Sequence, residues 1–148
     1  MKIQDRIFLK TNAEDLPMLT AIAESVDTDK YDDLVSLKDQ MLNMMQRNNG
    51  KGLAAPQVGL SQRIFIMFDK NNNLLFFVNP VILKASAMKA SNKEGCLSVP
   101  DKRVTKLRSR QVTVQYYDEN LNEKQIRVGG FDAVCIQHEI DHLNGVLL

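Results

Sequence analysis

The sequence predicts an α+β fold in which an N-terminal helix is followed by antiparallel strands and then by a helix that carries an HExxH motif. Three observations predict this fold. Apolar residues recur at helical spacing over residues 34–45, apolar β-rich or alternating runs lie between residues 63 and 128, and a helical pattern returns over 131–143. Helices that are separated from strands along the chain are typical of the α+β class.

The first third of the chain predicts one clear helix. The segment 16–26 is mildly apolar, with Pro17 near its start, and predicts either a short helix or an irregular segment. The turn-like residues 27–30 offer an N-cap for the helix whose apolar spacing covers 34–45. Residues 48–50 (Asn-Asn-Gly) suit a left-handed cap that ends this helix.

The middle of the chain predicts antiparallel strands. Residues 63–68 and 74–78 are apolar and rich in β-formers, and the five residues between them predict a hairpin. Another strand is expected to start at 81–83. Residues 111–117 alternate between apolar and polar, which predicts a half-buried strand, and 124–128 is expected to return beside it after a turn.

The last helix is predicted from Phe131 to Leu143, after two glycines break the preceding strand. It contains the run QHEIDH. His138 and His142 are one helical turn apart on one face, so their imidazoles can bind the same metal ion. Glu139, beside the first ligand, is placed to move protons at a metal-bound water.

A catalytic site of this kind usually has three protein ligands. Cys135 lies three residues before His138 and seven before His142 on the same helix. Such a row spans roughly 10 Å along the helix axis, too long to close readily around one ion with bonds of about 2.0–2.3 Å. Cys96, in the run EGCLSVP, is expected on a bend next to a strand and is the better third ligand. Cys135 is interpreted as a buried residue on the core side.

A third block, GKGLAAPQVG, occupies residues 50–59. Its small residues allow the backbone to approach another group closely. Gln57 offers an amide donor that could bind a developing oxyanion. Alone, this block would be interpreted as a tight loop that follows a helix.

Together, GxGLAAPQ, EGCLS and QHExDH resemble the peptide deformylases. The resemblance extends more loosely from Pro17 to the C-terminus and is weakest over the first fifteen or so residues. It implies a helix packed centrally between antiparallel sheets, a single catalytic domain over residues 1–148, and removal of the N-formyl group from the initiator methionine of nascent polypeptides, with release of formate. It also implies that the backbone N–H of Leu97 and the side-chain amide of Gln57 donate hydrogen bonds that stabilise the oxyanion.

The resemblance and the positions of the residues suggest a set of substrate-binding residues. Glycines would pair with the extended substrate backbone, and residues of the last helix would form walls for the methionine side chain. The set is Gly50, Lys51, Gly52, Gly95, Arg103, Phe131, Val134 and Cys135. Arg103 is either a contact to the peptide or a solvated surface residue. Lys51 departs from the family pattern, which is usually apolar there, and would hold its ammonium at the rim of the pocket.

Two further interactions are expected around the metal loop. The family pattern suggests an ion pair between Glu94 and Arg108 that supports this loop. Asp141 either orients a ligand histidine or is a solvated carboxylate on the helix.

The ligand types and the family resemblance point to different metal ions. Mixed sulfur and nitrogen ligation suits zinc. The resemblance implies Fe²⁺ as the native ion, with Ni²⁺, Co²⁺ or Zn²⁺ as substitutes. It implies N-formylmethionyl nascent peptides as substrates and the ribosome near its exit tunnel as a partner. Most relatives continue beyond the metal helix into a tail, whereas this chain ends at Leu148, as compact phage-encoded deformylases do.

The composition adds several expectations. With 44% hydrophobic and 25% charged residues, the chain has an ordinary globular profile, and its net charge of +1 gives no electrostatic case for nucleic-acid binding. No apolar run approaches the roughly 20 residues of a membrane span, and the first residues lack the long apolar segment of a secretory signal. A cytoplasmic monomer is expected, in a bacterium or in the host of a phage, with no membrane partner and no disulfide.

Two other functions share part of this pattern. A zinc endopeptidase would also contain HExxH, but EGCLS and GLAAPQ do not belong to such enzymes. A metal-stabilised module that binds N-termini without turnover would not need the proton shuttle that Glu139 provides.

Overall fold

A computed structural model describes residues 1–31 and 33–148. Its larger sheet has five strands in the order β1-β2-β3-β6-β7, and its smaller sheet pairs β4 with β5. All of these pairings are antiparallel. The predicted α+β class and antiparallel sheets are therefore confirmed.

The described residues form three α-helices, one short 3₁₀ helix and seven strands. The helices are α1 (Leu16–Thr20), α2 (Leu34–Arg47) and α3 (Gly130–Leu143), with a short 3₁₀ helix at Ala55–Val58. The strands are β1 (Gly52–Ala54), β2 (Ile64–Phe68), β3 (Leu74–Ala85), β4 (Lys89–Cys96), β5 (Val99–Ser109), β6 (Gln111–Tyr117) and β7 (Glu123–Gly129). Over the described residues, no helix combines the length and the apolar character that a membrane crossing needs.

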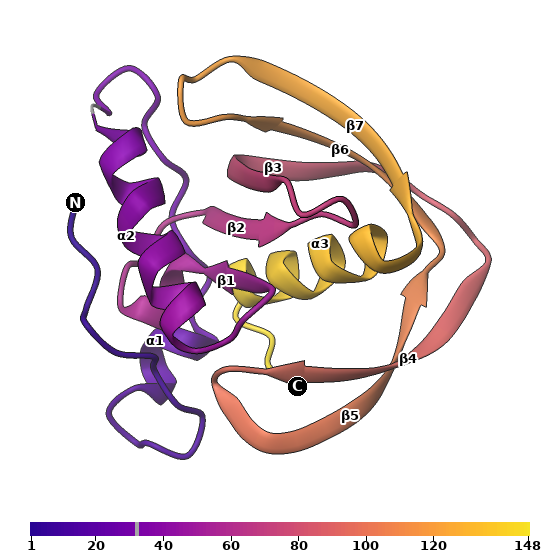
Figure 1. The fold of residues 1–148 in the computed structure, drawn as a ribbon, viewed down its shortest axis with the longest axis horizontal. Coiled ribbons are helices and arrows are strands. Elements are labelled where there is room, and N and C mark those ends of the chain that lie inside the picture. Colours follow the sequence, from indigo (N-terminus) through magenta and orange to yellow (C-terminus); the bar gives the residue numbers. More distant parts are fainter. Residues whose placement is uncertain (32) are drawn as a thin grey trace.

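Helix α3 lies between the two sheets, while α2 covers the far face of the larger one (Figure 1). The alternation of side chains along β2 produces this layering. Phe65 and Met67 pack in the cluster that contains the apolar residues of α3, whereas Ile64 and Ile66 pack with the leucines and methionines of α2. The methionines of α2 thus fill the core, as their helical spacing predicted.

The prediction that residues 27–30 cap α2 was wrong. The helix begins at Leu34, and its N-cap is Asp33, whose carboxylate accepts from the Ser36 N–H at 3.2 Å. Asp33 adopts a left-handed conformation (φ 66°), which the sequence did not indicate. At the other end, Asn49 is left-handed (φ 56°), so the predicted cap is confirmed.

A new strand does not begin at Val81, because β3 continues through Pro80. Proline lacks an N–H and usually interrupts a ladder. Here the register between β3 and β6 shifts between Val78 and Val81, and Asn79 turns to a positive φ of 49°. The Asn79 side chain then bonds both the N–H and the carbonyl of Val26, which fixes the irregularity in place.

The hairpin of β4 and β5 was not predicted as such; only a strand beside Cys96 was expected, and that is confirmed. Its sequence is polar on both strands, and most of its side chains are exposed or only partly buried. It therefore lacks the apolar alternation from which strands are predicted.

The N-terminal segment joins two parts of the chain that flank α3. Backbone N–H groups of Gln4 and Phe8 donate to the carbonyls of Val58 and Gln57, each at 2.7 Å, and Lys10 donates to Ser98 at 2.8 Å. These bonds connect the glycine-rich block to the loop that follows Cys96.

Candidate metal centre

Three possible metal-binding atoms converge where β4 meets α3. The Cys96 sulfur lies 3.3 Å from His142 Nε2, and the two histidine Nε2 atoms are 3.2 Å apart. All three atoms lie within 4.8 Å of one another. A thiolate and two imidazoles in this arrangement match the ligand types and the spacing of a tetrahedral site with one open position.

Local structure explains why these side chains meet. His138 and His142 are four residues apart on α3 and share a face. Glu94 and Cys96 are two residues apart in β4, so both point to the side of the hairpin that faces α3.

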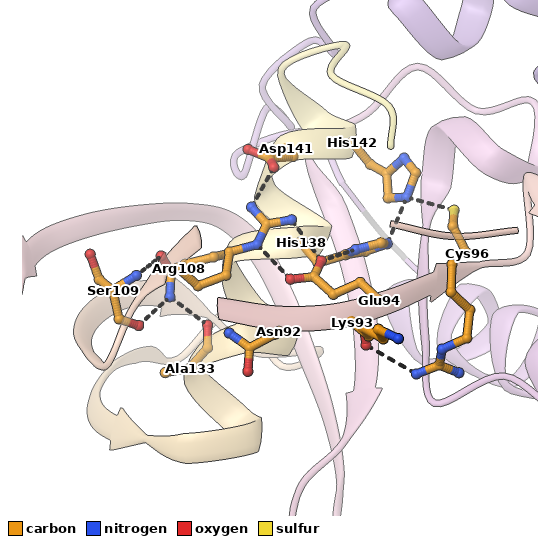
Figure 2. A network of polar contacts seen from close by, with 12 residues as sticks. Asn92, Lys93, Glu94, Cys96, Arg108, Ser109, Ala133, His138, Asp141 and His142 are labelled. Atoms are coloured by element: carbon orange, nitrogen blue, oxygen red, sulfur yellow. Dashed lines mark hydrogen bonds and ion pairs between the residues drawn. The ribbon is translucent and has the colours of Figure 1, made fainter. Parts of the chain in front are cut away.

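A chain of polar contacts orients the first histidine (Figure 2). His138 Nδ1 lies 3.0 Å from Glu94 Oε1, and Arg108 binds both Glu94 oxygens at 2.9 and 2.8 Å. Burial alone would raise the pKa of Glu94, but hydrogen bonds from Arg108 and His138 outweigh it and lower the pKa to about 2. Glu94 is thus a carboxylate that accepts from Nδ1–H, which fixes the ring so that its Nε2 lies beside His142 Nε2.

The expected ion pair between Glu94 and Arg108 is confirmed. Asp141 contacts Arg108 at 2.5 Å rather than a histidine. Asp141 is therefore neither a direct partner of a ligand histidine nor simply solvated. It binds Arg108, Arg108 binds Glu94, and Glu94 orients His138.

His142 is buried, with 2% of its surface exposed. Burial, and then the charges of His138 and Arg108, lower its pKa to about 3. The imidazole is therefore neutral, which is the form that binds metal ions. Among the described residues, its Nδ1 has no hydrogen-bond partner.

Glu139 is the second buried group with an unpartnered atom, since its Oε1 lacks a hydrogen bond within the described structure. Burial raises its pKa to about 7, although the His138 and Arg108 charges oppose this. A Cβ atom on Gly52 would lie 2.4 Å from Glu139 Oε2. Only glycine therefore allows β1 to pass so close to this carboxylate.

Gln57 is buried with its amide in a defined orientation. Its Oε1 accepts from the Ala54 N–H at 3.0 Å, so its Nε2 faces Ser98 Oγ at 3.1 Å and Cys96 Sγ at 3.5 Å. Leu97 follows Cys96 in the turn between β4 and β5. The glycine block, the EGCLS run and the HExxH helix thus meet at one place, although they are far apart in the chain.

A cleft of about 1140 Å³ opens beside these groups. Its walls include all eight residues expected to bind substrate, namely Gly50, Lys51, Gly52, Gly95, Arg103, Phe131, Val134 and Cys135. Their roles stay predictions. Arg103 is exposed and donates to the carbonyl of Lys93 at 3.0 Å. Cys135 is buried away from the three converging atoms, and burial raises the pKa of its thiol.

Sequence reasoning missed several polar residues around the site. Ser98, which binds the Gln57 amide, lies within EGCLS but was assigned no role. Lys93, Lys102 and Arg110 also line the cleft. The density of basic residues over 102–110 is a signal for Lys102 and Arg110, but it is uninformative until the hairpin is placed against α3, and Lys93 lies outside this stretch.

Comparisons with known proteins agree on one family. The model of the family described as polypeptide deformylase matches residues 9–148. A peptide deformylase of Treponema pallidum is 41% identical over 131 residues, which cover 88% of this chain and 80% of that protein.

Solved structures give the same result. A class I type b peptide deformylase from Acinetobacter baumannii superimposes with a TM-score of 0.90 at 35% identity, over 99% of this chain and 97% of that one. The deformylase of the Vibrio parahaemolyticus bacteriophage VP16T, in complex with actinonin, gives 0.88 at 36% identity, over 97% and 99%.

Proposed function

The chain belongs to the polypeptide deformylase family, and we propose that Cys96, His138 and His142 hold its metal ion while Glu139, Gln57 and Leu97 carry out the reaction. The family is metal-dependent, and its members are hydrolases that remove the N-formyl group of nascent polypeptides. The chain is accordingly a peptide deformylase. The observation that carries the assignment of residues is the convergence of a thiol and two imidazoles beside a buried carboxylate at the base of a cleft.

A divalent ion in such a ligand set polarises a carbonyl oxygen and lowers the pKa of water toward about 7. Glu139 is placed to take the proton of the attacking water and later to deliver it to the leaving amine. Its pKa of about 7, raised by burial, suits a group that both accepts and donates a proton near neutrality. The lack of a partner at Oε1 leaves that oxygen available for the transfer.

Two donors are proposed to stabilise the negative charge that develops on the formyl oxygen. The Gln57 amide is one, since the bond from Ala54 N–H to Oε1 turns the NH₂ group toward Cys96. The backbone N–H of Leu97, the residue next to Cys96, is the other. One such donor typically contributes about 2.7–4 kcal/mol to lowering the barrier.

The peptide is proposed to lie between two strand edges. Among the described strands, β1 is the terminal strand of the larger sheet and β4 pairs only with β5, so each has one edge without a strand partner there. Gly50, Gly52 and Gly95 line the cleft, and we propose that their backbone groups pair with an extended peptide. On the α3 side, Phe131, Val134 and Cys135 form the proposed wall for the methionine side chain.

Formate release tests the function directly. The protein loaded anaerobically with Fe²⁺, Ni²⁺ or Co²⁺ should release formate from formyl-Met-Ala-Ser. The same peptide without the formyl group should remain intact. Absence of formate with all three ions, or cleavage of the unformylated peptide, would contradict the assignment.

We propose Fe²⁺ as the native ion, with Ni²⁺, Co²⁺ or Zn²⁺ able to replace it. Mixed sulfur and nitrogen ligands accept all four ions. The test is metal analysis of anaerobically purified protein, together with the turnover of samples reconstituted with each ion. Turnover should be higher with iron or nickel than with zinc, and equal or greater zinc activity would count against the proposal.

We further propose that residues 1–148 act as one catalytic domain and as a monomer in the cytoplasm of a bacterium, or of a host if a phage supplies the protein. The proposed partners are N-formylmethionyl nascent peptides and the ribosome near its exit tunnel. Sedimentation velocity of the protein alone tests the monomer. Co-sedimentation with ribosomes that carry nascent chains tests the contact with the ribosome.

A further inference from the structure

The cleft beside the proposed metal centre is bordered by an unbalanced set of charges. Among the described residues, six lysines and arginines line it. Arg108 is buried and bound to Glu94, and the other five are exposed: Lys51, Lys93, Lys102, Arg103 and Arg110. We call these five residues the cationic rim. They come from the segment before β1 and from the β4–β5 hairpin and its end, on both sides of the proposed path of the peptide. The net charge of the whole chain is only +1, so this concentration of positive charge is local.

Acidic residues do not neutralise the rim. Within the described part of the chain, none of its five members takes part in an ion pair. Three acidic residues line the cleft. Glu94 is buried and is already bound by Arg108, and Glu139 is buried at the base of the cleft. Asp101 is the one exposed carboxylate among the described lining residues.

The substrate brings little positive or negative charge of its own to this region. A formyl group converts the N-terminal amine into a neutral amide, and the methionine side chain is uncharged. The first charges that meet the rim are therefore those of the side chains that follow methionine.

We propose that the cationic rim makes this protein select formylated peptides with acidic side chains at the second to fourth positions. This inference rests on the proposed function and specifies its substrate class. An acidic side chain near the rim gains attraction from several exposed cations, whereas a basic one is repelled. The contact lies away from the reacting bond and is the same in substrate and transition state, so it should act on KM more than on kcat.

The expected effect is moderate, because the cations are solvated. An exposed ion pair changes affinity by roughly 1.5- to 5-fold, and several cations around one carboxylate add to this. We expect kcat/KM for an acidic peptide to exceed that for its neutral counterpart by about 3- to 10-fold at low ionic strength. The preference should shrink toward unity as salt approaches about 1 M, where the screening length falls to about 3 Å.

The experiment uses the metal-loaded full chain and three peptide amides: formyl-Met-Ala-Glu, formyl-Met-Ala-Gln and formyl-Met-Ala-Lys. Amidation removes the C-terminal carboxylate, so the third side chain is the one charge that varies. We expect kcat/KM to be highest for the Glu peptide, intermediate for the Gln peptide and lowest for the Lys peptide. The difference should arise mainly from KM. Equal values for the three peptides at low salt would overturn the inference. If the Gln peptide releases no formate, the proposed function itself fails.

Substitutions test whether the cationic rim causes the preference for acidic peptides. The double variant Lys51→Gln with Lys102→Gln should lower the Glu-to-Gln ratio at least twofold. Lys84→Gln is the matched control, since Lys84 is an exposed lysine on β3 that lines a separate hollow. A ratio that falls equally in the control, or that stays unchanged in the double variant, would contradict the inference. A different result would be that a short RNA inhibits the turnover of all three peptides, with equal kcat/KM for Glu, Gln and Lys in its absence. That result would assign the rim to nucleic-acid binding and would also overturn the inference.

Discussion

The two carboxylates closest to the proposed ligand His138 have opposite environments. Glu94 is held ionised by Arg108. Glu139 is buried, its Oε1 has no partner among the described residues, and burial raises its pKa to about 7. One carboxylate can therefore orient a histidine while the other exchanges a proton. This division of roles leads to the first prediction.

Glu139→Gln should keep the metal and lose most of the activity. The amide has nearly the same shape but cannot accept the proton of water. Because general acid–base catalysis contributes about 10²–10⁴-fold, kcat should fall by at least that range. The measurement is formate release beside metal content. Substantial turnover in a metal-replete variant would remove Glu139 from the proposed role.

Cys96→Ser and Cys135→Ser should behave differently. Cys96 faces the two histidines, and a serine hydroxyl is a harder and normally un-ionised ligand, so this change should release the metal and abolish turnover. Cys135 lies apart from the three converging atoms, so its replacement should leave the metal content unchanged. Both variants are compared after purification under the same reducing conditions. Loss of metal from Cys135→Ser alone would mean that the ligand assignment is wrong.

At the scale of residues, the sequence predicted the convergence of the three motifs and, through the family resemblance, the Glu94–Arg108 ion pair, but not the other contacts around them. Spacing on a helix identifies His138 and His142, because four residues make about one turn. No spacing rule relates Arg108 to Asp141 or Ser98 to Gln57, since these contacts depend on how the hairpin lies against α3.

At the scale of elements, strong periodicity decided what could be predicted. Helices α2 and α3 and strands β2, β6 and β7 each carry apolar residues in a helical pattern, an alternation or a continuous run, and their predicted bounds agree with the structure to within a few residues. The β4–β5 hairpin is polar and was missed. The N-terminal segment was also missed. Backbone hydrogen bonds, which leave no trace in the side-chain pattern, help to hold it, and its Arg6–Asp15 ion pair follows no helix or strand spacing.

This N-terminal segment is the basis of a prediction about pH. Asp15 is buried and accepts from Arg6 at 2.7 and 2.6 Å and from the Leu9 N–H at 2.9 Å. The hydrogen bonds from Arg6 lower the pKa of Asp15 below its usual 3.8, against the opposing effect of burial. Its contribution to stability is therefore present above pH 3.8 and is lost as pH falls through the lowered folded-state pKa.

Asp15→Asn should accordingly reduce the melting temperature near pH 6, and the gap between wild type and variant should narrow toward pH 3. Thermal unfolding at a series of pH values measures this gap. Asp5→Asn is a suitable control, since Asp5 is exposed and its change should produce a small gap. A gap for Asp15→Asn that is constant with pH would show that its charge does not stabilise the fold.

At the scale of the whole molecule, the layers explain why metal binding and stability should be coupled. The proposed ligands come from the smaller sheet and from α3, which also packs against the larger sheet. An ion held by Cys96, His138 and His142 would thus connect the hairpin to the main core.

Removal of the metal should lower the melting temperature. A ligand present at about 100 times its Kd stabilises the native state by about 2.7 kcal/mol, which for a chain of this size corresponds to roughly 5–10 °C. The measurement compares metal-loaded protein before and after a chelator is added. Cys96→Ser serves as the control and should respond little. Identical melting temperatures before and after chelation would contradict the proposed link between hairpin and core.

The position of α3 in the chain has a consequence for biosynthesis. The helix occupies the space between the two sheets, yet it is made after every strand. While the ribosome is still translating the strands, the apolar face around Phe65 and Phe77 has no helix to cover it, and Cys96 has neither histidine beside it. Such an open apolar surface is the kind that chaperones recognise during synthesis. This enzyme, which acts on unfinished polypeptides, cannot assemble its own proposed metal centre until α3 has been made.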